Sequence, residues 1–149
     1  MTEPALLDVA RTIDKSPKLA SLLRGEWLGH PLHPVLTDLP IGFWTSAWVL
    51  DLLPGNRAAA RSLIGLGVLS AVPTAMAGAA DWVQMDRDKD NIAVPHAISN
   101  STATALYALS WWQRRRGHHW RGVIVAQLAA TAATVGGYLG GELAFGGNP

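Results

Sequence analysis

The stretch Gly29-His30-Pro31-Leu32-His33-Pro34 runs directly into an apolar segment that extends from Val35 to Leu53. A proline in the first turn of a helix costs no hydrogen bond, so Pro34 is well placed to begin this segment as a helix. Two histidines therefore stand where such a helix would meet water, and imidazole is a common ligand for metals and haem. The stretch predicts the first long helix of the fold and one part of a candidate site.

Outward from this stretch, the charged residues are spaced as in a membrane protein. Of the 149 residues, 49% are hydrophobic and only 15% are charged. No charged residue lies inside the intervals 62–80, 91–113 and 122–141. Each interval approaches the roughly 20 residues that a helix needs to cross the hydrocarbon core of a bilayer. The spacing therefore predicts further membrane helices after the first.

We predict an all-α fold, a four-helix transmembrane bundle in up-down-up-down order. One or two short amphipathic helices precede the bundle in an interfacial segment, because apolar and charged residues alternate there at helical spacing. Paired glycines in the last helix would let a neighbouring helix approach closely. A soluble bundle of unusually apolar helices is the alternative. The predicted ranges are 1–28 for the N-terminal segment and 29–149 for the membrane domain, with helices at about 34–53, 58–82, 95–113 and 121–145 and packing glycines Gly136, Gly137, Gly140 and Gly141.

Basic residues near the helix ends indicate an orientation. With four crossings, both termini share one side of the membrane, and the loops near residues 54–57 and 114–121 share the other. The Lys and Arg totals of the two sides are equal, but those of the second side lie in short loops tight against helix ends. The positive-inside bias acts most strongly there. We therefore expect cytoplasmic short loops and extracytoplasmic termini.

The same connectivity gathers polar residues near one membrane face. Ionisable side chains at membrane depth are costly and usually face a partner or a cavity, so a cluster of them is a candidate site. The residues expected at this face are His30, His33, Asp38, Asp81, His96, Asn100 and Glu142.

The order of these motifs resembles a known family. Gly-His-Pro-Leu-His-Pro is followed by Thr37-Asp38-Leu39-Pro40-Ile41-Gly42, then by Asp81-Trp82, and then by His96 with Asn100. This order is similar to that of the bacterial membrane family called domain of unknown function 2231. The resemblance implies a multi-pass protein of the bacterial plasma (inner) membrane. Because some relatives carry a C-terminal Rieske-type iron–sulfur domain, it also implies a Rieske-type protein or a larger redox complex as a candidate partner.

The first interpretation of the cluster is a b-type haem that serves electron transfer. His33 and His96 begin the first and third helices and would be diagonal partners in a four-helix bundle, where helices present axial ligands inward. Asn100 lies one helical turn below His96. A carboxylate that accepts the distal N–H of a ligating histidine fixes its tautomer. The candidates for that role are Asp38, Asp81 and Glu142.

Two other interpretations stay open. His30, His33 and His96 with a carboxylate have the ligand types of a copper or zinc site. Alternatively, the histidines cap their helices and Asp81 and Glu142 accept their N–H groups, which would make a cofactor-free structural or assembly subunit that docks on a larger membrane complex.

Composition argues against several functional classes. The chain contains no cysteine, so it cannot form a disulfide, a thiolate metal site or an iron–sulfur cluster by itself. A net charge of +1 gives no indication of nucleic acid as a partner. No nucleophile with its base and no phosphate-binding glycine loop is recognisable. We therefore expect a protein whose main partner is the lipid bilayer, and no enzyme.

Overall fold

The computed structural model describes residues 3–146, and within that range the chain is all-helical, as predicted. No strand occurs between residues 3 and 146. The predicted N-terminal segment and membrane domain also include residues 1–2 and 147–149, which lie outside the described residues. The α-helices are α1 (Glu3–Asp14), α2 (Pro17–Arg24), α3 (Leu32–Asp51), α4 (Arg57–Trp82), α5 (Asp90–Arg115) and α6 (His119–Phe145), with short 3-10 helices at Glu26–Leu28 and Arg87–Lys89.

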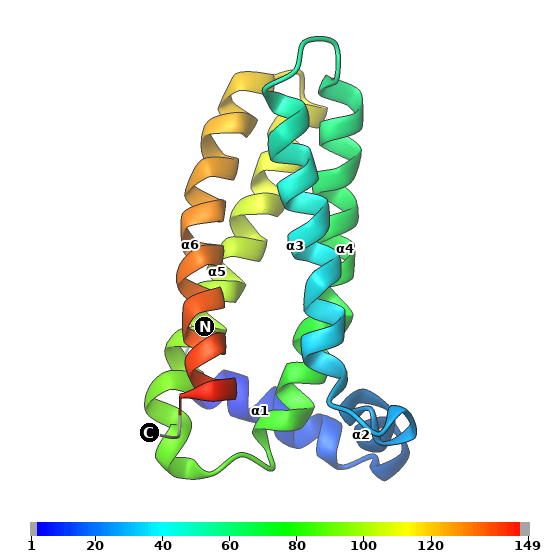
Figure 1. The fold of residues 1–149 in the computed structure, drawn as a ribbon, viewed down its shortest axis with the longest axis vertical. Helices are drawn as coiled ribbons and strands as arrows, with labels where there is room; N and C mark the ends of the chain where they lie inside the picture. The colour runs from blue at the N-terminus through cyan, green and yellow to red at the C-terminus, as the bar shows by residue number, and fades with distance from the viewer. Residues whose placement is uncertain (1–2, 147–149) are drawn as a thin grey trace.

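The four long helices form two antiparallel hairpins, α3–α4 and α5–α6, that stand side by side (Figure 1). Both hairpin loops lie at one end of the molecule, which we call the loop end. The loops are tight because Gly55 and Gly117 adopt positive φ angles of 83° and 85°, which residues with a Cβ rarely adopt. We call the opposite end, where α3 begins and α4 and α6 end, the histidine end.

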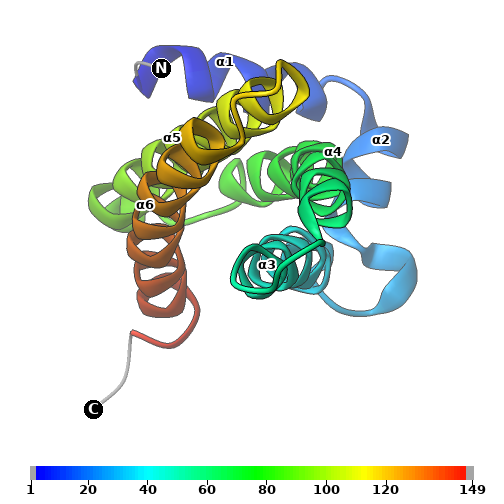
Figure 2. The same ribbon diagram turned by 90° about the horizontal axis from the view of Figure 1, so that it is seen from above.

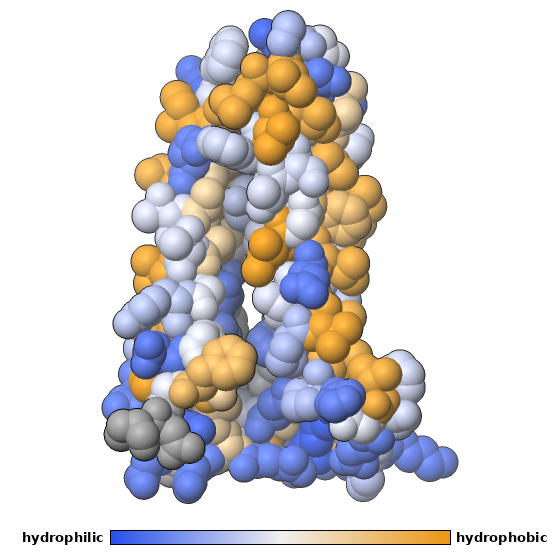
Figure 3. Space-filling model, in the orientation of Figure 1, coloured by the Kyte–Doolittle hydropathy of each residue, from blue (hydrophilic) through white to orange (hydrophobic). Residues whose placement is uncertain are grey.

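The two hairpins meet along α4 and α5, while α3 and α6 lie to one side (Figure 2). On the face viewed in Figure 3, the surface is hollowed between α6 and α3 over the half nearest the histidine end. The short helices α1 and α2 lie across this end (Figure 1). They are held to α4 by a small apolar cluster of Ile13, Ala20, Leu23 and Ala80.

Toward the loop end the two hairpins are joined by a continuous core. The rings of Trp44 on α3 and Tyr107 on α5 stack with centroids 4.0 Å apart and an interplanar angle of 15°. Ile64 on α4 and Ala126 and Ala129 on α6 complete the same cluster. Stacked aromatic pairs contribute about 0.5–1.5 kcal/mol beyond their buried area. This core closes one half of the bundle and leaves the hollow confined to the other.

The helix bounds agree with the sequence prediction except at the start of α5. The helix was expected from about residue 95, but it begins at Asp90, so Pro95 lies in its second turn. A carboxylate in the first turn favours helix initiation because it faces the positive end of the helix dipole. The Trp82 indole also donates a hydrogen bond of 2.9 Å to Asp90 Oδ1, which ties this turn to the end of α4. These contacts outweigh the preference of proline for the first turn.

Two helices, α4 and α6, are long and apolar enough to cross a membrane on the basis of length and composition. Large apolar residues on their outer faces are exposed, including Leu69 at 68% and Leu128 at 58%. Extended exposed apolar surface of this kind is typical of contact with lipid or with another protein. Crossings by α3 and α5 as well stay a prediction from the sequence.

Candidate functional site

His33 lies in the first turn of α3, with its imidazole against α4. Its Nδ1 is 2.8 Å from the main-chain oxygen of Thr74. The ring also lies against Gly78, because a Cβ built at that glycine would be 2.9 Å from both Cε1 and Nδ1 of His33. The absence of a side chain at residue 78 therefore lets the imidazole reach the backbone of α4.

His96 on α5 is held in the same manner by α6. Its Nδ1 is 2.9 Å from the main-chain oxygen of Gly136. A Cβ at Gly140 would lie 2.9 Å from Cε1 of the ring. Each histidine therefore contacts the second helix of its own hairpin at two residues that are four apart. Its Nδ1 bonds to the carbonyl oxygen of the first residue, and its ring packs against the second, a glycine.

These hydrogen bonds indicate which ring nitrogen carries the proton. A backbone carbonyl oxygen only accepts hydrogen bonds, so Nδ1 must be the donor in both His33 and His96. In a neutral imidazole the other nitrogen, Nε2, then has its lone pair free to act as a ligand. Histidines that bind metals usually have this arrangement, with the non-ligating N–H donated to a carbonyl or a carboxylate.

The two imidazoles lie next to each other although they come from different hairpins. Their centroids are 6.1 Å apart, and their planes are nearly perpendicular at 82°. The sequence prediction placed His33 and His96 as partners across the bundle, and the structure brings them together. This pair is the centre of the candidate site.

Asn100, one turn further along α5, lies against His96. Its Nδ2 donates to the main-chain oxygen of His96 at 3.0 Å and lies 3.3 Å and 3.4 Å from the two ring nitrogens. A Cβ at Gly136 would overlap the Asn100 amide, so the same glycine that accepts from His96 makes room for Asn100. Asn100 therefore helps to keep the His96 ring in place.

The other predicted residues are distributed unevenly around the pair. Asp81 is half-buried near the end of α4. Asp38 and Glu142 are exposed. His30 is exposed in the loop before α3, and residues 3–146 contain no group of three or more His, Cys, Asp or Glu side chains placed to hold a metal ion. The described part of the chain therefore does not assemble the predicted three-histidine copper or zinc site.

The paired glycines of α6 divide into two classes. Gly136 and Gly140 face α5, where Asn100 and His96 occupy the space that a Cβ would need. Gly137 and Gly141 have nothing within 4 Å of such a Cβ. One glycine of each pair therefore makes the predicted close approach, and the space beside it is filled by a side chain of the candidate site.

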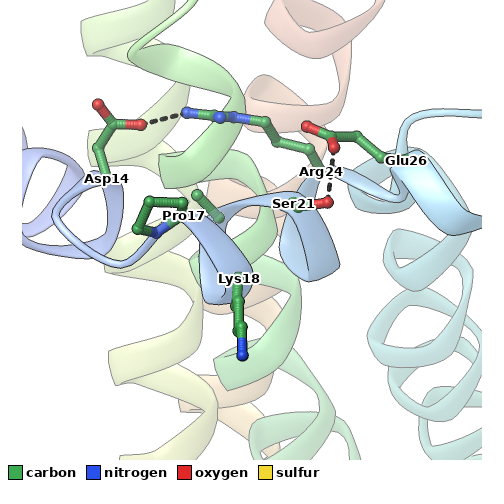
Figure 4. Close-up of a pocket in the computed structure, with 7 residues that line it drawn as sticks. Asp14, Pro17, Lys18, Ser21, Arg24 and Glu26 are labelled. Atoms are coloured by element: carbon green, nitrogen blue, oxygen red, sulfur yellow. Dashed lines mark hydrogen bonds and ion pairs between the residues drawn. The ribbon is translucent and has the colours of Figure 1, made fainter.

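An open pocket of about 640 Å³ lies near α2, and three of its four charged side chains already have partners. Arg24 is paired with Asp14 and also donates to the Ala80 main-chain oxygen, while Ser21 donates to Glu26 (Figure 4). Lys18 points away from these groups (Figure 4). The pocket is best explained as the joint that attaches α2 to the end of α4.

A second polar cluster at the loop end was not anticipated from the sequence. Arg114 on α5 forms a bidentate ion pair with Asp51 on α3, with both N–O distances at 2.6 Å. The two side chains are 1% and 4% exposed. Arg114 Nε also donates to Ser110, whose hydroxyl donates to the Gly122 main-chain oxygen at 2.7 Å. This buried cluster connects the two hairpins.

The signal that could have predicted this ion pair is an internal repeat in the sequence. Its spacing is 63 residues, which is the separation of Asp51 and Arg114. At the same spacing, His33 contacts His96 and Trp44 contacts Tyr107. Residues that contact their own equivalents are characteristic of two-fold pairing. The same spacing relates buried residues of α3 to buried residues of α5: Pro40 to Ala103, Trp44 to Tyr107 and Ala47 to Ser110. A spacing one residue shorter relates buried residues of α4 to buried residues of α6: Ala60 to Gly122, Ile64 to Ala126, Gly67 to Ala129 and Thr74 to Gly136.

Comparison with known proteins agrees with the resemblance found in the sequence motifs. A family model described as "Predicted membrane protein (DUF2231)" matches residues 29–148, which include all of α3 to α6. No curated protein and no solved structure matches the chain. The family description says membrane protein and names no activity or cofactor.

Proposed function

Since the chain belongs to the DUF2231 family of predicted membrane proteins, we propose that it is a membrane-embedded electron-transfer subunit with His33 and His96 as the axial ligands of a b-type haem. The observation that carries the proposal is that the two rings make the same hydrogen bond and lie next to each other. Each Nδ1 donates to a carbonyl oxygen, which leaves Nε2 as the ligand atom of each ring, and the rings lie together between the hairpins. The Asn100 amide, 3.4 Å from Nε2 of His96, would move aside when a metal binds there.

The separation of the rings suits a shared metal. With metal–nitrogen bonds of about 2 Å, two imidazoles on opposite sides of one metal have centroids roughly 6 Å apart. The observed centroid distance is 6.1 Å. Edge-to-face ring pairs also have centroids about 4.5–7 Å apart, so the distance fits a shared metal, and the binding experiment below distinguishes it from a structural pair.

The number of ligands favours haem over an isolated ion. Zinc sites use three or four protein ligands, and residues 3–146 supply no group of that size around the pair. A porphyrin brings four nitrogen ligands, so two histidines complete the coordination. When bound, haem would supply reversible one-electron chemistry at the level of His33 and His96.

The surroundings of the pair suit this role. The carbonyl oxygens of Thr74 and Gly136 hold each ring in one tautomer and increase the basicity of Nε2. The hollow between α3 and α6 opens on the same half of the bundle as the pair (Figure 3). The apolar helices around the site would exclude water, which influences the reduction potential of a metal centre.

The proposal includes a location and a class of partner. We place the protein in the bacterial plasma membrane with the histidine end extracytoplasmic, because the short arginine-bearing loops would face the cytoplasm. A site near that face suits exchange of electrons with a larger membrane complex or a Rieske-type protein. The chain itself would carry electrons and catalyse no reaction.

Optical spectroscopy and haem analysis test the proposal. The protein is produced with haem supplied and purified in mild detergent as wild type, His33→Ala, His96→Ala and the loop-end control His118→Ala. We expect a reduced-minus-oxidised haem spectrum near one haem per chain in the wild type and the control, and its loss in either site variant. A folded wild type without haem would refute the electron-transfer role. The histidine pair would then be a structural brace, as in the cofactor-free alternative.

A further inference from the structure

The loop end has a surface that the proposed redox role does not explain. Three arginines there lie over tryptophan rings: Arg57 over Trp120 at 5.7 Å, Arg115 over Trp111 at 4.9 Å and Arg116 over Trp112 at 4.9 Å. With the neighbouring exposed Arg61 and Arg121, we call these residues the arginine–tryptophan surface.

The positive charge of this surface is not neutralised by the protein. Asp51 is the one acidic residue in either hairpin between positions 39 and 80 or between 91 and 141. Its carboxylate is already engaged by Arg114 in the buried bidentate pair. Among the described residues, no carboxylate lies within ion-pair distance of any of the five arginines of the surface.

Apolar side chains adjoin the arginines directly. Leu52 and Leu53 at the end of α3 are 66% and 51% exposed, and Ile124 in the first turns of α6 is 64% exposed. Trp120 and Trp112 are 64% and 46% exposed. Hydrophilic and hydrophobic residues meet at this end in Figure 3. A surface that changes from cationic to apolar within one helical turn matches the boundary between lipid headgroups and acyl chains.

Arginine stacked on tryptophan is suited to binding phosphate. Stacking over the indole fixes the plane of the guanidinium group, and its N–H groups can then bind two phosphate oxygens at once. A tryptophan ring at the same position prefers the headgroup region of a bilayer. Each arginine near an anionic membrane surface contributes about 1 kcal/mol of attraction, which corresponds to about fivefold in affinity.

We propose that the arginine–tryptophan surface binds the phosphate groups of anionic phospholipids, and so fixes the loop end in the anionic leaflet of the membrane. The proposal is independent of the haem proposal, because the surface lies at the opposite end of the bundle from His33 and His96 (Figure 1). It also attributes the proposed membrane orientation to specific side chains.

Quenching of tryptophan fluorescence by brominated lipids tests the proposal. The full chain is reconstituted in vesicles of phosphatidylcholine and phosphatidylglycerol, with the bromines on the acyl chains of one lipid or the other. For the wild type we expect about fivefold or greater preference for brominated phosphatidylglycerol at low salt, decreasing as salt is raised. The variant Arg57→Gln/Arg115→Gln/Arg116→Gln should lose this preference while keeping all its tryptophans.

A matched control removes three basic residues from the histidine end, as Arg11→Gln/Lys15→Gln/Lys18→Gln, and should keep the preference. Inorganic phosphate at matched ionic strength should not displace the lipid more than chloride does. Equal quenching by both lipids in the wild type, or an unchanged preference in the Arg57/Arg115/Arg116 variant, would overturn the proposal. Selective displacement by phosphate would also overturn it, since the surface would then be a site for soluble phosphate.

Discussion

At the residue scale, the candidate site depends on two glycines that leave room for imidazole rings. Gly78 and Gly140 each face a histidine at 2.9 Å from the position of a Cβ. The histidines themselves were recognisable from sequence because each is adjacent to a proline near a predicted helix start. Gly140 was predicted only to allow helix packing and Gly78 was given no role, since a sequence does not show what fills the space that a glycine leaves.

Neighbouring glycines of α6 provide a direct comparison. Gly140→Ala should displace the His96 ring and weaken its bond to Gly136, at a cost of about 1–3 kcal/mol in stability. Gly141→Ala meets no atom within 4 Å and should be neutral or stabilising by up to about 1 kcal/mol, because alanine favours helix. Denaturation of both variants in detergent, followed by circular dichroism, measures the difference. Equal stability of the two variants would contradict the position assigned to His96.

Trp44 gives a second prediction at this scale. Its indole nitrogen is buried and has no hydrogen-bond partner among the described residues, so the ring contributes by stacking on Tyr107. Trp44→Phe keeps one aromatic ring but removes the unpaired N–H group together with the rest of the second ring of the indole, so it should cost about 1–3 kcal/mol. Trp44→Ala should cost about 3–5 kcal/mol. The same denaturation measurement would argue against the stacking role if the phenylalanine variant were as unstable as the alanine variant.

At the element scale, the helices themselves were predictable because charge-free intervals and glycine or proline turns mark them clearly. The start of α5 was not, since it depends on the contact between Trp82 and Asp90 from two separate helices. The pairing of Asp51 with Arg114 was missed for a similar reason. An arginine in a run of three at a helix end has the pattern of a solvated loop residue, and only the packing of α5 against α3 buries it.

The buried ion pair leads to a prediction based on the two-fold correspondence. Asp51→Ala or Arg114→Ala should each cost about 3–5 kcal/mol, because the remaining partner stays buried and charged. Ala47 and Ser110 occupy equivalent positions in the two hairpins, so the ion pair and its serine can be exchanged together. Gly122 leaves room for Arg114 and corresponds to Ala60, so these two residues must be exchanged as well. The exchanged variant Asp51→Arg/Arg114→Asp/Ala47→Ser/Ser110→Ala/Ala60→Gly/Gly122→Ala should therefore recover most of the stability.

Denaturation of the single variants and the exchanged variant in detergent, followed by circular dichroism, makes this comparison. If the exchanged variant is no more stable than Asp51→Ala, the two hairpins are not equivalent around the ion pair. Recovery would show that either hairpin can supply either charge.

At the scale of the whole molecule, two similar hairpins place equivalent residues of α3 and α5 in contact with each other. The order of the helices was sufficient to predict that His33 and His96 would meet. The repeat itself was not recognised, because the equivalent residues differ in type: histidine matches histidine, but aspartate matches arginine. Whether the pair binds a cofactor stays a prediction, since the residues alone also suit a structural role.

The orientation of the molecule can be tested with single cysteines, because the chain has none of its own. Ser16 lies between α1 and α2 at the histidine end, and His118 lies in the α5–α6 loop at the loop end; both are exposed. We expect a membrane-impermeant thiol reagent added to spheroplasts to label Ser16→Cys and not His118→Cys, which would react only after lysis. Labelling of both variants from outside would contradict the three crossings, an odd number, that α3, α4 and α5 would make between Ser16 and His118, and with them the proposed orientation.

Electron paramagnetic resonance of the oxidised protein tests the role of the histidine pair most directly, because the spin state of ferric haem reports its axial ligands. The purified wild type is compared with His33→Ala and His96→Ala after haem is supplied to all three. We expect a low-spin signal from the wild type, as two imidazole ligands require, and a high-spin signal or no bound haem in each variant. A low-spin signal that persists in both variants, or a folded wild type that binds no haem, would contradict the assignment of His33 and His96 as a ligand pair.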